Sequence, residues 1–286
     1  MFDLRYHVAS LAAVFIALIL GIVIGVGLSG SGVTKEADLK VARLDRDKAR
    51  AEAQAYKEQR DQLRKASNAF DRVYPVVMQD LLLGKRVAVL FVGRVDGGLA
   101  SEIETALTDA GAHPAMRTLA LKVPIDVKQL DNALIAQGPQ LERYVGDDKL
   151  DVLGSALADE FINGGETPVW KALGRVLVGE RTGNVRQRAD GVVVVRTIKP
   201  QEGATARFLR GLYTGLASSD APAVGVEDTG TTPSAIPTFD DRGLASVDDI
   251  DLDTGRAALA LLLAGARSGH YGVRDDAEAI LPETGG

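Results

Sequence analysis

His113 and Met116 are the two residues of this chain that could most readily hold a metal ion together. An H-x-x-M arrangement offers one borderline and one soft donor, and this combination suits copper in a compartment without competing thiols. A larger methionine site cannot be built from three methionines and no cysteine. The alternative interpretation is a histidine in a turn followed by a core methionine. The sequence therefore requires no cofactor, and copper is the one that this pair would suit.

Carboxylates gather near the C-terminal end of the chain, where they could bind a hard cation or another protein. Their spacing does not match the calcium loop of an EF-hand. Helix capping ahead of Thr254, together with solvation, is the alternative explanation. Four residues of this stretch are candidates for docking a partner protein: Asp248, Asp249, Asp251 and Arg256.

The sequence offers little material for catalysis. Gly93, Gly97 and Gly98 follow an apolar run at the place of a dinucleotide-binding loop, but VGRVDGG does not match G-x-G-x-x-G. The chain also lacks HExxH and G-x-S-x-G motifs, and three histidines leave few candidates for a general base. We therefore predict that the protein is not an enzyme.

Composition and charge narrow the class of protein. The 286 residues carry a net charge of −6, with 46% hydrophobic and 25% charged residues, which is typical of globular proteins. Binding of nucleic acid would require a basic face, so we expect no nucleic-acid partner. A globular part of about 200 residues buries enough surface to fold without disulfides or structural metals, in agreement with the absence of cysteine.

An uncharged apolar segment near the N-terminus, Val8–Leu28, is long enough to cross a bilayer as a helix. A cleaved signal peptide, the alternative, would have a shorter apolar core. We predict a transmembrane anchor at residues 7–29 after a tip at residues 1–6, and Gly21 and Gly25 would let another helix approach this anchor closely. The basic residues on either side leave the orientation of the anchor open.

Residues 30–70 are predicted to form a helical stalk, because residues 35–69 contain neither proline nor glycine and interleave charges of both signs. Membrane anchoring raises the local concentration of partner helices, which favours a parallel homodimeric coiled coil. A single amphipathic helix that packs on another part of the protein is the alternative. The apolar positions of the heptad-like seam are Ala37, Val41, Leu44, Ala51 and Ala55.

Residues 71–281 alternate apolar strands with helices and are followed by a tail at residues 282–286. This alternation predicts a Rossmann- or flavodoxin-like three-layer α/β domain with a mostly parallel sheet. Trp170–Val178 fits a helix or, at its end, a short strand. Strands are expected at Val87–Val92, Ala115–Leu121, Gly191–Arg196 and Ala223–Glu227. Further helices are expected at Ser101–Ala110, Val127–Gln137, Val152–Ile162, Thr205–Leu216 and Thr254–Ala266.

Two stretches of the chain resemble a known family. The segment Leu4–Gly25, LRYHVASLAAVFIALILGIVIG, is similar to the N-terminus of the mycobacterial copper transport protein B (MctB) family. Val247–Asp251, Gly255-Arg256 with the apolar helix that follows, and Gly269–Gly272 are similar to the C-terminal block of that family. Because the order of anchor, stalk and α/β domain is also the same, the resemblance covers nearly the whole chain.

The resemblance implies an actinobacterial cell-envelope protein with residues 1–6 in the cytoplasm and the large domain outside the cytoplasmic membrane. It also implies a role in copper transport or copper homeostasis, and the family label implies an outer-membrane pore. A single spanning helix cannot line a pore, and the anchor has no polar stripe with which an oligomer could line one. We therefore expect the chain to act by oligomerisation and protein docking.

The resemblance extends to SteB-like envelope proteins, which implies an alternative role. In that role the chain would be a coiled-coil regulator or scaffold that controls a peptidoglycan hydrolase during cell separation. The expected partners are the membrane, a second copy of the chain through the stalk, and another envelope protein of the cell-separation machinery. A metal bound by His113 and Met116 would favour copper handling, whereas capture of a partner without metal would favour the regulator.

Overall fold

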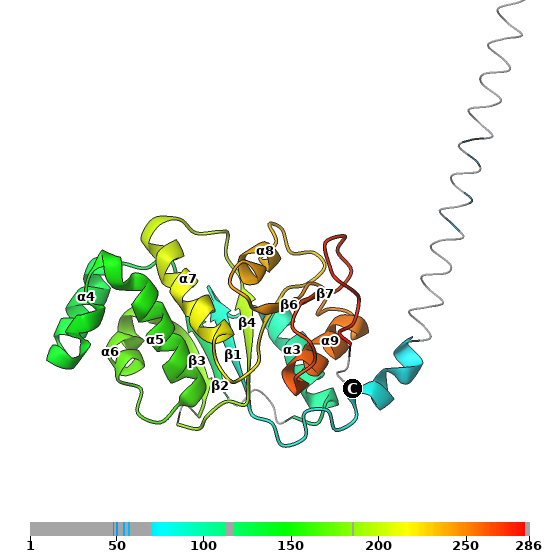
Figure 1. Ribbon diagram of the computed structural model, residues 1–286, viewed down its shortest axis with the longest axis horizontal. Coiled ribbons are helices and arrows are strands. Elements are labelled where there is room, and N and C mark those ends of the chain that lie inside the picture. The colour runs from blue at the N-terminus through cyan, green and yellow to red at the C-terminus, as the bar shows by residue number, and fades with distance from the viewer. Residues whose placement is uncertain are drawn as a thin grey trace, which may run out of the picture. The chain divides into compact units, whose positions relative to one another are not determined.

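The computed structural model of the protein, shown in Figure 1, describes residues 48, 50, 54, 57, 70–112, 117–184 and 186–283. The chain divides into two compact units, Met1–Asn68 and Ala69–Gly286. The predicted anchor with Gly21 and Gly25, and the five predicted seam positions of the stalk, lie outside the described residues. In the first unit the four described residues, Lys48, Arg50, Gln54 and Lys57, are helical. No helix within the described ranges has the length and apolarity needed to cross a bilayer.

The second unit is built on a seven-stranded sheet with the order β3-β2-β1-β4-β5-β6-β7. All neighbouring strands are parallel except β2 and β3, which pair antiparallel. The order from β3 to β6 is that of a doubly wound Rossmann sheet. The predicted α/β class and mostly parallel sheet are therefore confirmed. The strands are β1 Val87–Val92, β2 Arg117–Leu121, β3 Val178–Gly183, β4 Gly191–Arg196, β5 Ala223–Val226, β6 Ala245–Val247 and β7 His270–Tyr271.

Helices cover both faces of the sheet and form two separate cores (Figure 1). One core lies under α4 to α8, and the other lies under α3, α9 and the helical residues 70–78. The α-helices are α3 Gly97–Asp109, α4 Val127–Ile135, α5 Leu150–Asn163, α6 Pro168–Leu177, α7 Gly203–Ala217, α8 Ile236–Asp240 and α9 Asp253–Ala264. Two short 3-10 helices, η1 Pro139–Tyr144 and η2 Asp147–Lys149, lie between α4 and α5.

The central strands are apolar because helices cover both of their sides. Every residue of β1 and of β4 is buried. Successive side chains of a strand point to opposite faces, so Leu90 and Val92 of β1 enter one core while Val89 and Phe91 enter the other. The predicted strands at these two positions are confirmed with the same bounds.

The elements that the sequence did not predict are short or polar. Strands β6 and β7 contain three and two residues, and α8 contains five, which is too few for a periodic pattern to show. Trp170–Val178 is almost entirely helix α6, and the strand β3 follows it. Five of the six residues of β3 are exposed, so hydropathy gives no signal for this edge strand.

Helices α5 and α7 lie side by side and cross closely at three glycines, Gly154, Gly211 and Gly215 (Figure 1). A Cβ atom on Gly211 would lie 2.0 Å from the main-chain oxygen of Asp151. Backbone atoms cannot move aside as a flexible side chain does, so a methyl group here would force the helices apart. The close approach of α5 and α7 therefore depends on glycine at position 211.

We expect Gly211→Ala to lower the free energy of unfolding by about 3 kcal/mol, at the upper end of the usual effect of overpacking. The measurement is urea unfolding of the full chain in a neutral detergent, followed by the fluorescence of Trp170, the single tryptophan. Gly174→Ala in α6 is the matched control, because a Cβ atom there meets nothing within 4 Å. That control should raise stability by about 0.5–1 kcal/mol, and equal effects of the two substitutions would contradict the prediction.

Candidate functional site

The predicted metal pair His113 and Met116 lies outside the described residues. Within the described ranges the histidine and methionine side chains are those of His270 and Met78. Met78 is fully buried in a hydrophobic core, and His270 is 5% exposed and bonded to Asp248. The same ranges contain no group of three or more His, Cys, Asp or Glu side chains suited to a metal ion. The described domain therefore presents no soft donor on its surface.

The carboxyl ends of β1 and β4 form the crevice in which doubly wound folds bind nucleotides. Asp96 lies here, and its carboxylate caps α3 and accepts a hydrogen bond of 3.0 Å from the main-chain nitrogen of Leu99. Thr197 also lies here. A Cβ atom on Gly93 would lie 2.4 Å from its Oγ1 atom, which donates to the main-chain oxygen of Arg94 at 2.8 Å. A cavity of about 760 Å³ is open beside these residues, but the Asp96 carboxylate in its lining would repel a pyrophosphate.

Asp248, a predicted docking residue, is completely buried at the carboxyl end of β6. It accepts hydrogen bonds from His270 Nε2 at 2.7 Å and from the main-chain nitrogens of Val273 and Arg274 at 2.8 and 3.2 Å. Burial raises the pKa of Asp248, but these hydrogen bonds outweigh burial and hold it below its usual range. The carboxylate thus fastens the C-terminal segment to the sheet.

Asp249, the next residue, is also fully buried but has fewer partners. Its Oδ2 atom accepts a hydrogen bond of 2.7 Å from Thr254, whereas its Oδ1 atom has no partner in the described part of the chain. Burial raises the pKa of Asp249 to about 6, and the nearby charges of Asp248 and Asp251 act in the same direction. Asp249 is therefore a buried carboxylate with incomplete hydrogen bonding rather than a solvated one.

Asp251 and Arg256 also bond inside the domain. Asp251 accepts hydrogen bonds from the main-chain nitrogen and the hydroxyl of Thr229 at 2.8 and 2.6 Å. Arg256 pairs with Glu102 of α3 at 2.6 Å and with Asp253 at 2.5 Å, and it thereby joins α9 to α3. These bonds give all four predicted docking residues a structural role, and docking at this block stays a prediction.

The alternative explanation by solvation and helix capping does not hold for Asp248 and Asp249. Solvation does not apply to Asp248 and Asp249, which have no exposed surface. Capping does not apply either, because the N-cap of α9 is Leu252, without a side-chain hydrogen bond. The carboxylates are instead part of a buried polar network.

Glu227 is a buried member of this network that the sequence analysis missed. It is 1% exposed, follows β5 directly, and accepts hydrogen bonds from Ser234 and from the main-chain nitrogen of Ala235 at 2.7 and 2.6 Å. Arg274 pairs with it at 2.8 Å. The available signal was an acidic residue directly after an apolar strand, since the carboxyl ends of parallel strands meet at one edge of the sheet.

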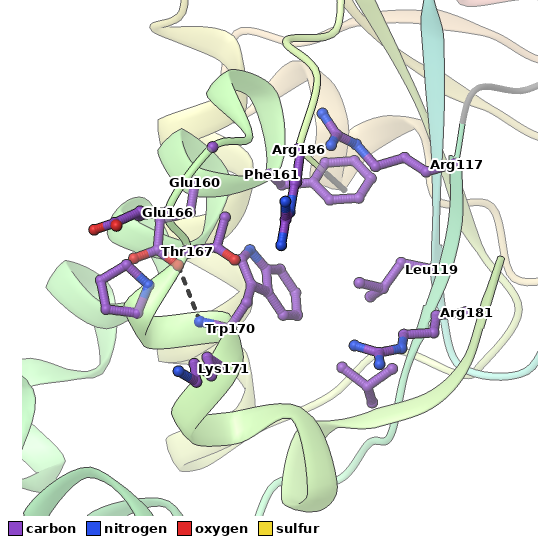
Figure 2. A pocket seen from close by; sticks show the side chains of 13 residues that line it. Arg117, Leu119, Glu160, Phe161, Glu166, Thr167, Trp170, Lys171, Arg181 and Arg186 are labelled. Atoms are coloured by element: carbon purple, nitrogen blue, oxygen red, sulfur yellow. Dashed lines mark hydrogen bonds between the residues drawn. The ribbon is translucent and has the colours of Figure 1, made fainter. Parts of the chain in front are cut away.

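A cavity of about 770 Å³ with several charged side chains in its lining lies between β2, β3, the end of α5 and the start of α6 (Figure 2). We call it the cationic pocket. Figure 2 shows the guanidinium groups of Arg181 and Arg186 and the ring of Trp170 directed into it. Its lining residues are Arg117, Leu119, Glu160, Phe161, Gly165, Glu166, Thr167, Pro168, Trp170, Lys171, Val178, Arg181 and Arg186.

Arg117 forms a buried part of this pocket and is 2% exposed. Its guanidinium lies 5.3 Å from the centre of the Phe161 ring and donates to the main-chain oxygens of Ile162 and Asn184 at 3.2 and 3.3 Å. Its Nε atom has no partner, and no carboxylate pairs with it among the described residues. Burial lowers the pKa of Arg117 to about 10, so the group is still charged at neutral pH.

The carboxylate nearest to the pocket's aromatic wall is already bound. Glu160 accepts hydrogen bonds from the main-chain nitrogens of Val169 and Trp170 at 3.0 and 2.9 Å, and it thereby caps α6. Burial raises the pKa of Glu160 against the lowering effect of these bonds. The sequence analysis missed this pocket. The local signal in the sequence was an arginine at the start of a short, mostly apolar strand, RTLAL.

A family model and the sequences of known proteins each match nearly the whole chain. Residues 1–282 match the family model described as "Copper transport outer membrane protein, MctB". The Copper transporter MctB of Mycobacterium tuberculosis (strain ATCC 25618 / H37Rv) is 28% identical over 330 residues, which cover 98% of this chain and 99% of that protein. The Copper transporter MctB of Mycobacterium bovis (strain ATCC BAA-935 / AF2122/97) has the same identity and coverage.

Proposed function

This chain belongs to the MctB family, and from that premise we propose that it serves copper homeostasis as a docking protein of the cell envelope. In this proposal residues 7–29 anchor the chain in the cytoplasmic membrane and the α/β domain lies outside. The chain acts through contacts with a second copy and with another envelope protein. It neither forms a pore by itself nor carries the metal on its folded domain.

The observation that carries this proposal is the burial of the described copper-type donors. Copper prefers thiolate, thioether and imidazole ligands. In the described domain such side chains are Met78, with no exposed surface, and His270, which bonds Asp248 at 2.7 Å. Because the described surface offers copper no such donor, we infer that the chain contributes to copper handling through protein contacts.

A candidate docking face lies on the helical residues 70–78. Tyr74 and Met78 pack this helix onto the core, whereas Val73 and Val76 on another side are 48% and 73% exposed. The occupant that we propose is a second copy of the chain. Ala69 and Val76 lie 14 and 21 residues after the seam position Ala55 and so continue the predicted seam, and Val73 lies between them, one position beside it.

The test is the double substitution Val73→Glu with Val76→Glu, which places charges in the proposed seam. We expect the full chain in a neutral detergent to change from dimer to monomer by light scattering. In cells that lack the gene, this variant should fail to restore growth at high copper. Because exposed substitutions usually change stability by less than about 0.5 kcal/mol, unfolding should be nearly unaffected.

Val152→Glu in α5 is the matched control, because Val152 is a 52% exposed valine on a helix. It should remain dimeric and restore copper tolerance. The double substitution His113→Ala with Met116→Ala tests the opposing mechanism. If calorimetric titration showed tight copper binding that this variant loses together with copper tolerance, direct metal handling would replace the docking proposal.

The same burial of donors supports the second candidate, a SteB-like regulator of a peptidoglycan hydrolase, because this role also needs docking without metal. The two roles differ in what dimer loss should change in cells. Normal copper tolerance with chains of unseparated cells in the Val73→Glu, Val76→Glu strain would favour the regulator. Lost copper tolerance with normal separation would favour copper homeostasis.

A further inference from the structure

We propose that the cationic pocket binds a phosphate ester that carries an apolar group. This site is separate from the proposed docking face, and it does not depend on the role in copper homeostasis. The proposal rests on three features of the pocket: an unpaired buried arginine, an excess of cations drawn from different elements, and a rigid aromatic wall.

The unpaired arginine is the strongest indication that the site is built for an anion. A buried charge is unfavourable unless an opposite charge or hydrogen bonds compensate for it. Arg117 is 2% exposed and has two long hydrogen bonds, to the main-chain oxygens of Ile162 and Asn184, but no carboxylate partner in the described chain. An anion in the adjoining pocket would provide the missing countercharge.

Three further cations reach the pocket from separate elements. Arg181 belongs to β3, Arg186 follows β3, and Lys171 belongs to α6. None of these three makes an ion pair with a described residue within 4.0 Å, and all three are exposed. Their charges are therefore available to a ligand.

The acidic residues of the pocket do not cancel this charge. Glu160 is directed at the main-chain nitrogens that begin α6, and Glu166 is exposed at the rim. Against two carboxylates the pocket has four cations, which matches the double charge of a phosphate monoester. Arginine forks bind phosphate oxygens in pairs, so the arginines favour phosphate over a halide or other simple ion.

The apolar part of the lining requires an apolar group on the ligand. Trp170 is held in place because its indole Nε1 donates to the main-chain oxygen of Leu157 at 2.8 Å and its ring packs 6.2 Å from that of Phe161. Leu119 and Val178 extend the apolar lining. A cavity of about 770 Å³ lies within the range of small-molecule sites, so a bare phosphate would leave most of it unfilled.

The test is calorimetric titration of the full chain, in a neutral detergent at low salt, with phenyl phosphate, inorganic phosphate and phenol. We expect phenyl phosphate to bind at least tenfold more tightly than inorganic phosphate, and phenol not to bind. Dioctanoyl phosphatidic acid distinguishes the source of the ligand. Tighter binding of this lipid than of phenyl phosphate assigns the site to a lipid headgroup, and the reverse assigns it to a soluble ester.

Two sets of variants separate binding from folding. Arg117→Met should weaken phenyl phosphate binding at least tenfold and, without ligand, raise the melting temperature, because it removes an uncompensated buried charge. Arg181→Gln with Arg186→Gln should abolish binding and leave the melting temperature unchanged. Arg188→Gln is the matched control, since Arg188 is an exposed arginine of the same loop that does not line the pocket, and it should bind as the unmodified chain does.

Three results would overturn the proposal. The first is a chain that does not bind phenyl phosphate. The second is phenol binding as tightly as phenyl phosphate, which would make the site merely apolar. The third is unchanged affinity in both Arg117→Met and the Arg181→Gln, Arg186→Gln variant, which would place any bound phosphate elsewhere.

Discussion

Asp248→Ala is expected to lower the free energy of unfolding by about 3–5 kcal/mol, the usual effect of removing one partner from a buried ion pair. Asp248 has no exposed surface, and its loss leaves His270, which is 5% exposed, without its partner. The main-chain nitrogens of Val273 and Arg274 also lose their acceptor. The C-terminal segment should then detach from the edge of the sheet.

The same substitution should flatten the pH dependence of stability. The pKa of Asp248 is lowered by folding, so its contribution is present above about pH 4 and is lost as the pH falls through the folded value. Burial lowers the pKa of His270, but the hydrogen bond to Asp248 and nearby carboxylates raise it on balance. Its contribution is present below about pH 6.5 and is lost as the pH rises through the folded value.

Urea unfolding of the full chain between pH 3 and 9 measures both effects. The contribution of the pair should be greatest between about pH 4 and pH 6.5. Asp241→Ala serves as the control. Asp241 is an exposed aspartate outside the strands, so its substitution should change stability little. A loss of less than about 1 kcal/mol in Asp248→Ala would mean that this network does not hold the C-terminal segment.

Asp249→Asn is expected to have the opposite sign and to stabilise the protein by about 3 kcal/mol at pH 8. Burial, with the charges of Asp248 and Asp251, raises the pKa of Asp249 from 3.8 to about 6, and a difference of one pKa unit is worth about 1.4 kcal/mol. A raised carboxyl pKa destabilises the fold as the pH rises through the folded value. Asparagine has the same shape, accepts the bond from Thr254, and removes the buried charge.

The pH dependence of the stability difference between Asp249→Asn and the unmodified protein tests this prediction. At about pH 3 and below the carboxyl is largely protonated in both the folded and unfolded chain, so Asp249→Asn and the unmodified protein should be nearly equally stable there. The difference should grow between about pH 4 and pH 6 and then remain constant. Asp241→Asn at the exposed position should give no such profile. A stabilisation of Asp249→Asn that is independent of pH would contradict the buried-charge explanation.

These two neighbouring aspartates show where sequence reasoning about the site stops. The chain reads Asp248-Asp249, and capping or solvation accounts for either residue from the sequence alone. In the fold, Asp248 has three hydrogen-bond donors that lie 22 to 26 residues ahead, whereas Asp249 has one donor and an oxygen without a partner among the described residues. Their pKa values therefore move in opposite directions, because distant parts of the chain set the environment of each.

The sequence by itself determined the class of the domain and most of its longer elements. Apolar runs such as VAVLFV and GVVVVR indicate strands covered on both sides, and 3.6-residue periodicity indicates the helices between them, because both signals depend on which side chains must leave water. The resemblance in the segments Leu4–Gly25 and Val247–Gly272 likewise indicated the family that the comparison with residues 1–282 shows. Anchor, stalk and the His113 and Met116 site remain predictions from the sequence.

Only the tertiary structure decided the sites. The cationic pocket unites Arg117 with Lys171, Arg181 and Arg186, which lie more than 50 residues further along the chain, and the pairing of β2 with β3 brings them together. The fold likewise brings Glu227 to Arg274 and Asp248 to His270, two residues of the C-terminal segment. Burial and hydrogen bonding are properties of neighbours in space, so hydropathy along the chain cannot show whether a charged residue is solvated, paired or left without a partner.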